Sequence, residues 1–259
     1  MDYINFKIMK TKNKDLFIIF GTTRGIGKAF LKHAEKNNKN DFILINRKII
    51  NIAGKNNHKK VVIDLSQLLT KTKISRLCGI FLKQKKYNSI NLILNASTID
   101  PIEAIGFVKD ELLLESAYVN FLNYERIINI FISETQNSDF KKKILIISSG
   151  SAESPNAGLS SYSSAKAALE MFVKCVFLEQ KELRQAKILA LRPGIVNTNM
   201  QKKIRSASKD DFPDSGRYKD LFKKNKLLNP EAVGEKMYHL LKTDKYWQNP
   251  VINISDIKL

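Results

Sequence analysis

Short runs of consecutive apolar residues alternate along the chain with segments in which apolar residues recur every three or four positions. The runs have the length of strands, and the segments between them have the spacing of amphipathic helices. The first run, 16–20, ends at Gly21, and Ile26, Phe30 and Leu31 follow with helical period. The runs that predict strands are 16–20, 42–45, 61–63, 90–94, 144–147, 188–191 and 251–252. The clearest helical segments are 110–135, 159–184 and 230–242.

This order of elements predicts the fold class. Continuous apolar strands that alternate with helices are typical of a parallel sheet buried on both faces. We therefore expect an α/β protein, a single-domain, Rossmann-like, doubly wound parallel sheet of about seven strands flanked by helices. We expect residues 1–14 to be an N-terminal extension, 15–259 to form the one domain, and the polar stretch 201–226 to lie outside its core.

The chain is strongly basic, with a formal net charge of +19. Such a charge can indicate a protein that binds nucleic acid or an anionic membrane surface. The lysines are scattered over many segments, however, and the densest cluster, 141–143, leads directly into a predicted strand. We expect a solvated basic surface whose field favours phosphorylated cofactors, and no nucleic-acid partner. A surface that binds polyanions remains the alternative.

The remaining composition is that of a globular protein, with 43% hydrophobic and 27% charged residues. No window approaches the ~20 continuous apolar residues of a membrane span, and the start lacks the apolar stretch of a secretory signal. Cys78 and Cys175 lie in apolar helical patterns without metal-ligand spacing, so we expect reduced core residues and no metal site. These features predict a cytoplasmic protein.

A glycine-rich turn follows the first predicted strand and opens the first helix. A helix start can hold a phosphate, because its first N–H groups have no partner and the helix dipole adds positive charge. Glycines let the backbone turn tightly and approach a pyrophosphate. A turn that merely caps the helix is the alternative. The predicted cofactor-binding residues here are Gly21, Thr23, Arg24, Gly25, Ile26 and Gly27.

The end of the second strand indicates which dinucleotide is bound. An acidic residue there would bind the ribose 2′-hydroxyl and repel a 2′-phosphate, whereas an arginine would bind that phosphate. The chain has Arg47 and Lys48 and no carboxylate at this position, and Arg24 could reach the same phosphate. We therefore predict NADP(H) in preference to NAD(H), unless Arg47 is an ordinary surface cation. Asp64 could bind the adenine amino group, or only cap the helix that follows it.

Tyr162 and Lys166 are a candidate acid–base pair, because residues four apart on a helix project from the same face. A tyrosine ordinarily has a pKa near 10. A unit charge at ~4 Å contributes about 4 kcal/mol at an effective dielectric of 20, or roughly three pKa units. We therefore expect Lys166 to lower the pKa of Tyr162 toward neutrality.

Ser149 ends a predicted buried strand, at the edge where parallel sheets place their chemistry. Its hydroxyl could bind a substrate carbonyl oxygen and stabilise the alkoxide that forms there. Ser148, Ser151 and Ser154 lie nearby and are interpreted as loop hydroxyls.

Taken together, these motifs resemble the short-chain dehydrogenase/reductase family from about 16 to 254. The resemblance implies that Tyr162 is the general acid of carbonyl reduction, that Lys166 assists it and holds the nicotinamide ribose, and that Ser149 orients the substrate. It further implies that Asn120 anchors a water-mediated proton relay. The motifs are GTTRGIG (21–27), NA (95–96), YVN with Asn120, ISSGSA (147–152), YSSAK (162–166) and RPGIVNT (192–198). The further cofactor-contacting positions that it implies are Asn95, Ala96, Pro193, Gly194, Val196 and Thr198.

The chain departs from the family pattern at three positions. Phe20 replaces a threonine, and Leu94 and Ser97 replace the outer residues of the common NNAG element. Because that element stabilises the central strand and lines the adenosine side, cofactor affinity is affected more than chemistry. Asn120, Ser149, Tyr162 and Lys166 are all present.

Within the family, the layout is similar to the sepiapterin reductase and benzil reductase branch. That resemblance implies reduction of a ketone flanked by a second carbonyl, as in a pterin side chain or an α-diketone. Segment 199–226, with Met200, Phe212 and Tyr218, would cover the substrate, although a partly disordered polar loop is the alternative. The family resemblance also implies that helices 110–135 and 159–184 pair between subunits, so we expect a homodimer or homotetramer.

Three other functions remain open. The first is a binding or regulatory protein that kept the fold and lost turnover. The second is a polyanion-binding protein, as the net charge of +19 allows. The third is a dehydratase or epimerase on the same scaffold.

Overall fold

The computed structural model describes residues 14–48, 58–82, 87–183 and 185–259, apart from a few side chains near the end of segment 58–82. The predicted extension therefore lies outside the described residues, except for Lys14, which is the first residue of the first strand.

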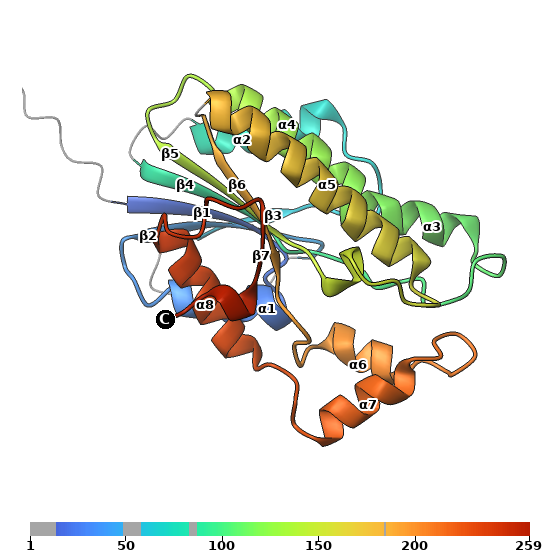
Figure 1. Ribbon diagram of the computed structural model, residues 1–259. Coiled ribbons are helices and arrows are strands. Elements are labelled where there is room, and N and C mark those ends of the chain that lie inside the picture. Colours follow the sequence, from blue (N-terminus) through green and yellow to red (C-terminus); the bar gives the residue numbers. More distant parts are fainter. Residues whose placement is uncertain (1–13, 49–57, 83–86, 184) are drawn as a thin grey trace, which may run out of the picture.

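Seven parallel strands form a single sheet in the order β3-β2-β1-β4-β5-β6-β7. The chain passes from β3 on one edge back to the centre at β4, so the strand order reverses between β1 and β4 (Figure 1). The predicted fold class is confirmed. The strands are β1 (Lys14–Phe20), β2 (Asn40–Asn46), β3 (His58–Val62), β4 (Tyr87–Leu94), β5 (Lys141–Ile147), β6 (Lys187–Arg192) and β7 (Val251–Asn253).

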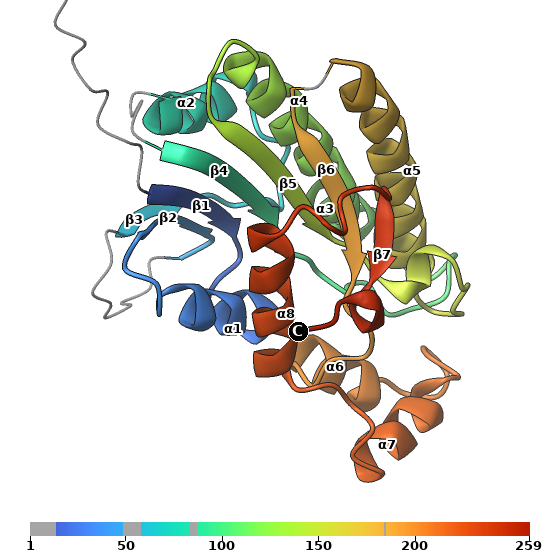
Figure 2. The same cartoon turned by 60° about the vertical axis from the view of Figure 1, so that its left-hand side comes forward.

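Helices cover both faces of this sheet, as Figures 1 and 2 show. On one face lie α1 (Gly25–Ala34) and α8 (Pro230–Lys242), and on the other lie α2 (Lys71–Leu82), α4 (Asn123–Thr135) and α5 (Ser160–Leu183). No helix in the described part of the chain is long and apolar enough to cross a membrane.

The two helical layers explain why the strands are continuously apolar. In β1, Phe17 and Ile19 belong to the core beneath α1 and α8, whereas Leu16, Ile18 and Phe20 belong to the core beneath α2, α4 and α5. All five side chains are at most 2% exposed. Successive side chains of a strand point to opposite faces, so both sets must be apolar.

The predicted helix 110–135 is one continuous rod with an irregularity in its middle. It consists of α3 (Asp110–Ala117), a π-helical turn at Tyr118–Leu122, and α4. The π-helical turn contains Asn120, whose side chain is fully buried. Such single turns often occur at functional sites, because they redirect one side chain within an otherwise regular helix.

The polar segment after β6 is ordered as two helices, α6 (Asn199–Ser206) and α7 (Ser215–Lys223). Both lie beyond the carboxyl ends of the strands, outside the two helical layers (Figure 2). A third apolar cluster attaches them to the domain: Ile204 and Phe212 pack with Ile99, Leu159 and Tyr162. Although its sequence is mostly polar, this segment therefore contributes to a small apolar cluster.

Two details of composition differ from the expectations. Cys175 is exposed on the outer side of α5 and is not a core residue, because the apolar residues of this helix occupy more than its buried face; the side chain of Cys78 lies outside the described residues. In the 141–143 cluster, Lys142 and Lys143 are buried and not solvated. The Lys143 ammonium donates to the carbonyls of Leu241 and Thr243 and so closes the end of α8.

Candidate active site

The predicted site residues come from segments far apart in the sequence, which the topology brings to one edge of the sheet. The glycine turn follows β1, Asn95 and Ala96 follow β4, Ser149 follows β5, and Pro193 follows β6. All of these strands are parallel, so their carboxyl ends meet at the same edge. The reversal of strand order between β1 and β4 lies there too, which is where open α/β sheets bind ligands.

The glycine turn has the geometry of a phosphate-binding helix start. Gly21 and Gly25 have φ of 87° and 57°, in the left-handed region that favours glycine. A Cβ on Gly27 would lie 1.9 Å from the carbonyl oxygen of Gly21. The helix begins without a side-chain cap and without an acidic residue in its first turn, and both Thr23 and Arg24 are exposed. These features fit a pyrophosphate.

Residues at the end of β4 support this turn. The Asn95 side-chain amide donates to the carbonyl of Gly21 at 2.7 Å, and the Ala96 N–H donates to that of Phe20 at 2.9 Å. Ile26 packs against the core beneath α1 and α8. Asn95 and Ala96 therefore hold the backbone of the turn through these hydrogen bonds, whether or not they also contact a cofactor.

Thr22 and Asn46 form a second support of the turn, which was not predicted from the sequence. The Asn46 side-chain oxygen, at the end of β2, accepts the Thr22 N–H at 2.7 Å, and the two side chains also bond to each other. Both residues are buried. The only signal was a polar residue closing an apolar strand, which by itself has many explanations.

Arg47 and Lys48 are exposed at the end of β2, as a role in binding an anionic cofactor requires. Asp64 accepts the Ser66 N–H at 2.9 Å and so holds the turn after β3. It does not cap the helix that follows, because α2 begins only at Lys71. Its contact with adenine stays a prediction. The hydrogen bond from Ser66, with a smaller effect of the Arg47 charge, lowers the pKa of Asp64. Arg47 therefore lies close enough to Asp64 for their charges to interact.

Tyr162 and Lys166 lie together on the first turns of α5, and both are buried. The Lys166 ammonium donates to the carbonyl of Ile147 at 2.8 Å and lies 5.7 Å from the centre of the Tyr162 ring. Ser149 begins the short turn Gly150–Ala152, where its hydroxyl accepts the Ser151 N–H at 3.1 Å. The predicted acid, cation and substrate-orienting hydroxyl are therefore neighbours.

The electrostatics of the pair differ from the expectation. Burial raises the pKa of Tyr162, and hydrogen bonding to the hydroxyls of Ser149 and Ser97 opposes that rise. Lys166 does not reverse this rise, because desolvation of the enclosed ring is the largest effect on the pKa of Tyr162. Burial also lowers the pKa of Lys166 to about 8, against the opposing charge of Glu170.

Asn120 is held by four hydrogen bonds. Its amide nitrogen donates to the Thr98 carbonyl at 3.0 Å and to the Ser116 hydroxyl at 3.2 Å. Its oxygen accepts the Thr98 N–H at 3.1 Å and the Ser97 hydroxyl at 2.6 Å. Ser97 also lies beside Tyr162, where its hydroxyl lowers the pKa of the predicted acid.

Glu170 and Arg192 form a buried support that the sequence analysis also missed. Glu170 accepts two hydrogen bonds from Arg192, at 2.8 and 2.7 Å, and one from the Ser148 hydroxyl at 2.7 Å. Ser148 is therefore a buried structural residue, not a loop hydroxyl. Glu170 follows Lys166 by one helical turn, and this spacing was the available signal. The cluster ties α5 to the ends of β5 and β6.

The loop after β6 returns to the glycine turn. Pro193 is buried, Gly194 has a φ of 73°, and Val196 pairs with Leu228 in an isolated parallel bridge. Thr198 caps α6, and its methyl group would lie 3.3 Å from a Cβ on Gly25. This loop therefore lies against the start of α1, as cofactor-contacting positions require.

Comparisons with known proteins agree with this geometry. The model of the family described as short chain dehydrogenase matches residues 15–209. The benzil reductase ((S)-benzoin forming) of Bacillus cereus is 31% identical over 250 residues, which are 92% of this chain and 98% of that protein. The enzyme of the same name from Bacillus subtilis (strain 168) is 29% identical over 88% of this chain and 93% of its own. The crystal structure of the KRED1-Pglu enzyme superposes with a TM-score of 0.79 at 24% identity, covering 92% of this chain and all of that one (100%).

Proposed function

The chain belongs to the short-chain dehydrogenase family, and on that premise we propose that it is an NADP(H)-dependent carbonyl reductase. Its substrate is a ketone flanked by a second carbonyl, of the benzil or sepiapterin type. The observation that carries the proposal is the meeting of Tyr162, Lys166 and Ser149 at the carboxyl edge of the sheet, beside the glycine turn.

The residues around the glycine turn would hold the cofactor. The uncapped start of α1 takes the pyrophosphate, and Arg47, assisted by Arg24, takes the 2′-phosphate of NADP(H). Lys166 holds the nicotinamide ribose, and Val196 and Thr198 border the cofactor from the loop after β6. When bound, the nicotinamide supplies the hydride. The positive charge of the chain, +19, favours the more highly phosphorylated cofactor.

The protein itself supplies the proton and orients the ketone. Tyr162 gives its hydroxyl proton to the carbonyl oxygen, and Ser149 donates a hydrogen bond to the same oxygen as charge develops on it. Ser149 can do so because its oxygen, not its hydrogen, is engaged by the Ser151 N–H. Lys166 stabilises the phenolate that remains, and Asn120 anchors the path by which the proton is replaced.

Segment 199–226 covers the substrate. Its Phe212 packs with Tyr162 in the third apolar cluster, and Met200 and Tyr218 lie at the border of that cluster. Phe212 and Tyr218 are in aromatic contact, with 5.6 Å between ring centres. An apolar, aromatic border beside the acid suits a diketone with aromatic or pterin substituents, and the names of both Bacillus relatives support this substrate class.

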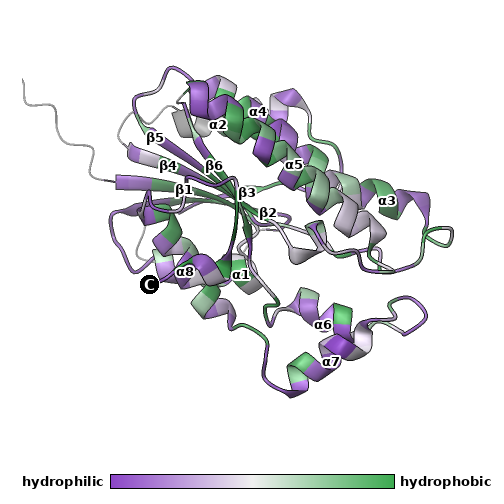
Figure 3. Cartoon of the chain, in the orientation of Figure 1, coloured by the Kyte–Doolittle hydropathy of each residue, from purple (hydrophilic) through white to green (hydrophobic). Residues whose placement is uncertain are grey.

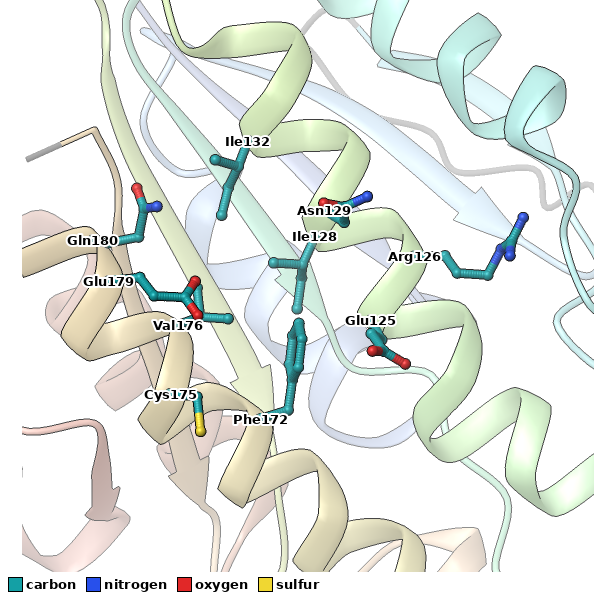
Figure 4. Close-up of a pocket in the computed structure, with 10 residues that line it drawn as sticks. All are labelled: Glu125, Arg126, Ile128, Asn129, Ile132, Phe172, Cys175, Val176, Glu179 and Gln180. Atoms are coloured by element: carbon teal, nitrogen blue, oxygen red, sulfur yellow. The ribbon is translucent and has the colours of Figure 1, made fainter. Parts of the chain in front are cut away.

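The protein acts as a homodimer or homotetramer that pairs through α4 and α5. Figure 3 shows hydrophobic residues along these outer helices. A cavity of about 420 Å³ opens between them (Figure 4), and Arg126 Nε and Gln180 Oε1, which are residues of its lining, are buried without a hydrogen-bond partner within the described chain. A second copy would cover the apolar surface of these two helices.

A substrate panel tests the proposed activity. Benzil-like diketones and pterins are offered with NADPH and with NADH, and consumption of each cofactor is followed by its absorbance. Wild type should oxidise NADPH with at least one diketone. Tyr162→Phe should bind NADPH normally by fluorescence and lose turnover by roughly 100-fold or more, the usual contribution of a general acid.

Tyr246→Phe is the matched control, because it removes a phenol hydroxyl near the C-terminal end of the chain, and it should retain full activity. If the wild type consumes neither cofactor with any carbonyl, or if Tyr162→Phe is as active as wild type, the proposed function is refuted.

A further inference from the structure

Ser97 occupies a position where the common NNAG element has a glycine, and its hydroxyl lies inside the site. Its Oγ donates to the Asn120 oxygen at 2.6 Å, a short hydrogen bond for two neutral groups. Glycine could not make this bond. The departure from the family pattern therefore adds one functional group to the surroundings of Tyr162.

The neighbours of Asn120 determine the direction of this bond. The Asn120 side-chain nitrogen donates to the carbonyl of Thr98 and to the hydroxyl of Ser116. Because these two acceptors fix the nitrogen, the side-chain oxygen must face Ser97. A carbonyl oxygen only accepts, and Ser97 must therefore donate. The Asn120 oxygen also accepts the Thr98 N–H at 3.1 Å, so it keeps one partner if Ser97 turns away.

Tyr162 lies on the other side of Ser97. The hydroxyls of Ser97 and Ser149 both lower the pKa of Tyr162 against the effect of burial, so both lie beside the phenol. While the phenol is neutral, Ser97 has its own hydrogen on Asn120, and its oxygen can accept from the Tyr162 hydroxyl. A phenolate oxygen, in contrast, only accepts, and the closest hydroxyl hydrogens must turn toward it.

We propose that Ser97 is a positioning residue whose hydroxyl bridges Asn120 and Tyr162 and whose hydrogen turns from Asn120 to the phenolate once Tyr162 has given up its proton. The inference rests on the proposed function, in which Tyr162 is the acid. In this step the Tyr162 O–H bond breaks and the alcohol O–H bond forms. No bond to Ser97 breaks, and Asn120 keeps the Thr98 N–H.

Other groups around Tyr162 complete the electrostatic setting. Lys166, on the same helix, and Tyr218, from α7, are the titratable groups that face it. Glu170 acts on Lys166. Ser97 and Ser149, from the loops after β4 and β5, are uncharged, so replacing Ser97 changes no charge in the site.

The test compares both reaction directions across pH. Ser97→Ala removes one donor to the phenolate, which should raise the pKa of Tyr162 in the working enzyme by about one unit. Ketone reduction needs the protonated phenol, so its alkaline limit should move up by about one pH unit. Alcohol oxidation needs the phenolate, so at neutral pH it should slow roughly tenfold. NADPH affinity should stay within about twofold of the wild-type value, a ΔΔG below about 0.4 kcal/mol.

Ser97→Thr keeps a hydroxyl and should restore the wild-type pH profiles of ketone reduction and of alcohol oxidation. That result would also show that the position tolerates a larger side chain. Ser154→Ala, at an exposed loop serine, is the matched control and should leave both unchanged. An equal loss in both directions, or unshifted profiles in Ser97→Ala, would overturn the inference, since a structural defect lowers both rates together.

Failure of the proposed function would be recognised separately, by a wild type without turnover. In that case NMR titration of ring-labelled tyrosine, with Tyr162→Phe assigning the signal, still tests the bridge. A Tyr162 pKa that is higher in Ser97→Ala than in wild type would support the bridge between Asn120 and Tyr162, and identical titrations would refute that bridge.

Discussion

At the scale of single residues, the polar side chains around Tyr162 include three that are almost fully buried, and each of the three has hydrogen-bond partners. Lys166 is 1% exposed, Glu170 3% and Asn120 0%. An isolated charge or amide in such surroundings would cost several kcal/mol, and pairing removes most of that cost. The hydrogen bonds to Ile147, Arg192 and Thr98 also leave each group a single orientation. The site is therefore rigid before any substrate arrives.

Arg47, by contrast, is exposed and carries the prediction of cofactor choice. Arg47→Asp replaces the cation proposed to bind the 2′-phosphate with an anion, which would repel that phosphate and can bind a ribose hydroxyl. The ratio of kcat/KM with NADPH to that with NADH should fall roughly tenfold to a hundredfold, the range of a charge-assisted hydrogen bond. Steady-state kinetics with the best substrate of the panel measure this ratio.

Lys36→Asp is its control, because it makes the same charge change at an exposed position just beyond the C-terminal end of α1. It should leave the ratio nearly unchanged. If Arg47→Asp leaves it unchanged as well, another group binds the 2′-phosphate.

At the scale of elements, close backbone packing fixes α1, and with it the glycine turn. A Cβ on Gly234 of α8 would lie 2.6 Å from the backbone of both Ala29 and Phe30 of α1. Only a glycine permits the two helices to approach this closely. Since α1 also begins at the glycine turn, the position of the N–H groups proposed to bind phosphate depends on Gly234, far along the chain.

Gly234→Ala should therefore destabilise the protein by about 2 kcal/mol, because an added methyl group in a tight contact forces the helices apart. Urea unfolding monitored by circular dichroism gives the free energy of unfolding. Gly216→Ala, in α7, is the control: a Cβ there meets nothing within 4 Å. It should be neutral, or stabilising by up to about 1 kcal/mol through helix propensity. Equal stabilities of the two variants would contradict the packing argument.

At the scale of the whole molecule, one side of the helical layer is apolar beyond what its own core requires. Met171 and Leu178 are 58% and 64% exposed on α5, and exposed Cys175 lies between them on the same face. A monomer would leave this surface in water, whereas pairing with a second copy buries it. The assembly proposed above therefore depends on this face.

Leu178→Glu tests whether two copies of the protein pair through this face of α5. Two copies of a carboxylate near a symmetric interface repel each other and lose apolar burial, so the dissociation constant should rise at least about tenfold. Sedimentation velocity at several protein concentrations measures this change. Val62→Glu, at a 52% exposed position on the edge strand β3, should sediment like wild type. An assembly that is unaltered in Leu178→Glu would place the interface elsewhere.

The order of strands and helices was predictable from the sequence, because it depends on periodicities that neighbouring residues display. Run 144–147 reads as a strand from its four apolar residues alone. The structure extends that strand back to Lys141, since backbone pairing with β4 includes lysines whose polarity hides them from the pattern. The pair Tyr162 and Lys166 was likewise visible, because residues four apart on a helix share a face.

Tertiary structure alone decided the contacts between segments distant in the sequence. Glu170 meets Arg192, Thr22 meets Asn46, and Ser97 reaches both Asn120 and Tyr162 only because parallel strands end at one edge. It also decided the pKa of Tyr162, since desolvation depends on everything that encloses the ring. Local spacing determines which face a side chain occupies, whereas its partners and its exposure to water depend on the whole fold.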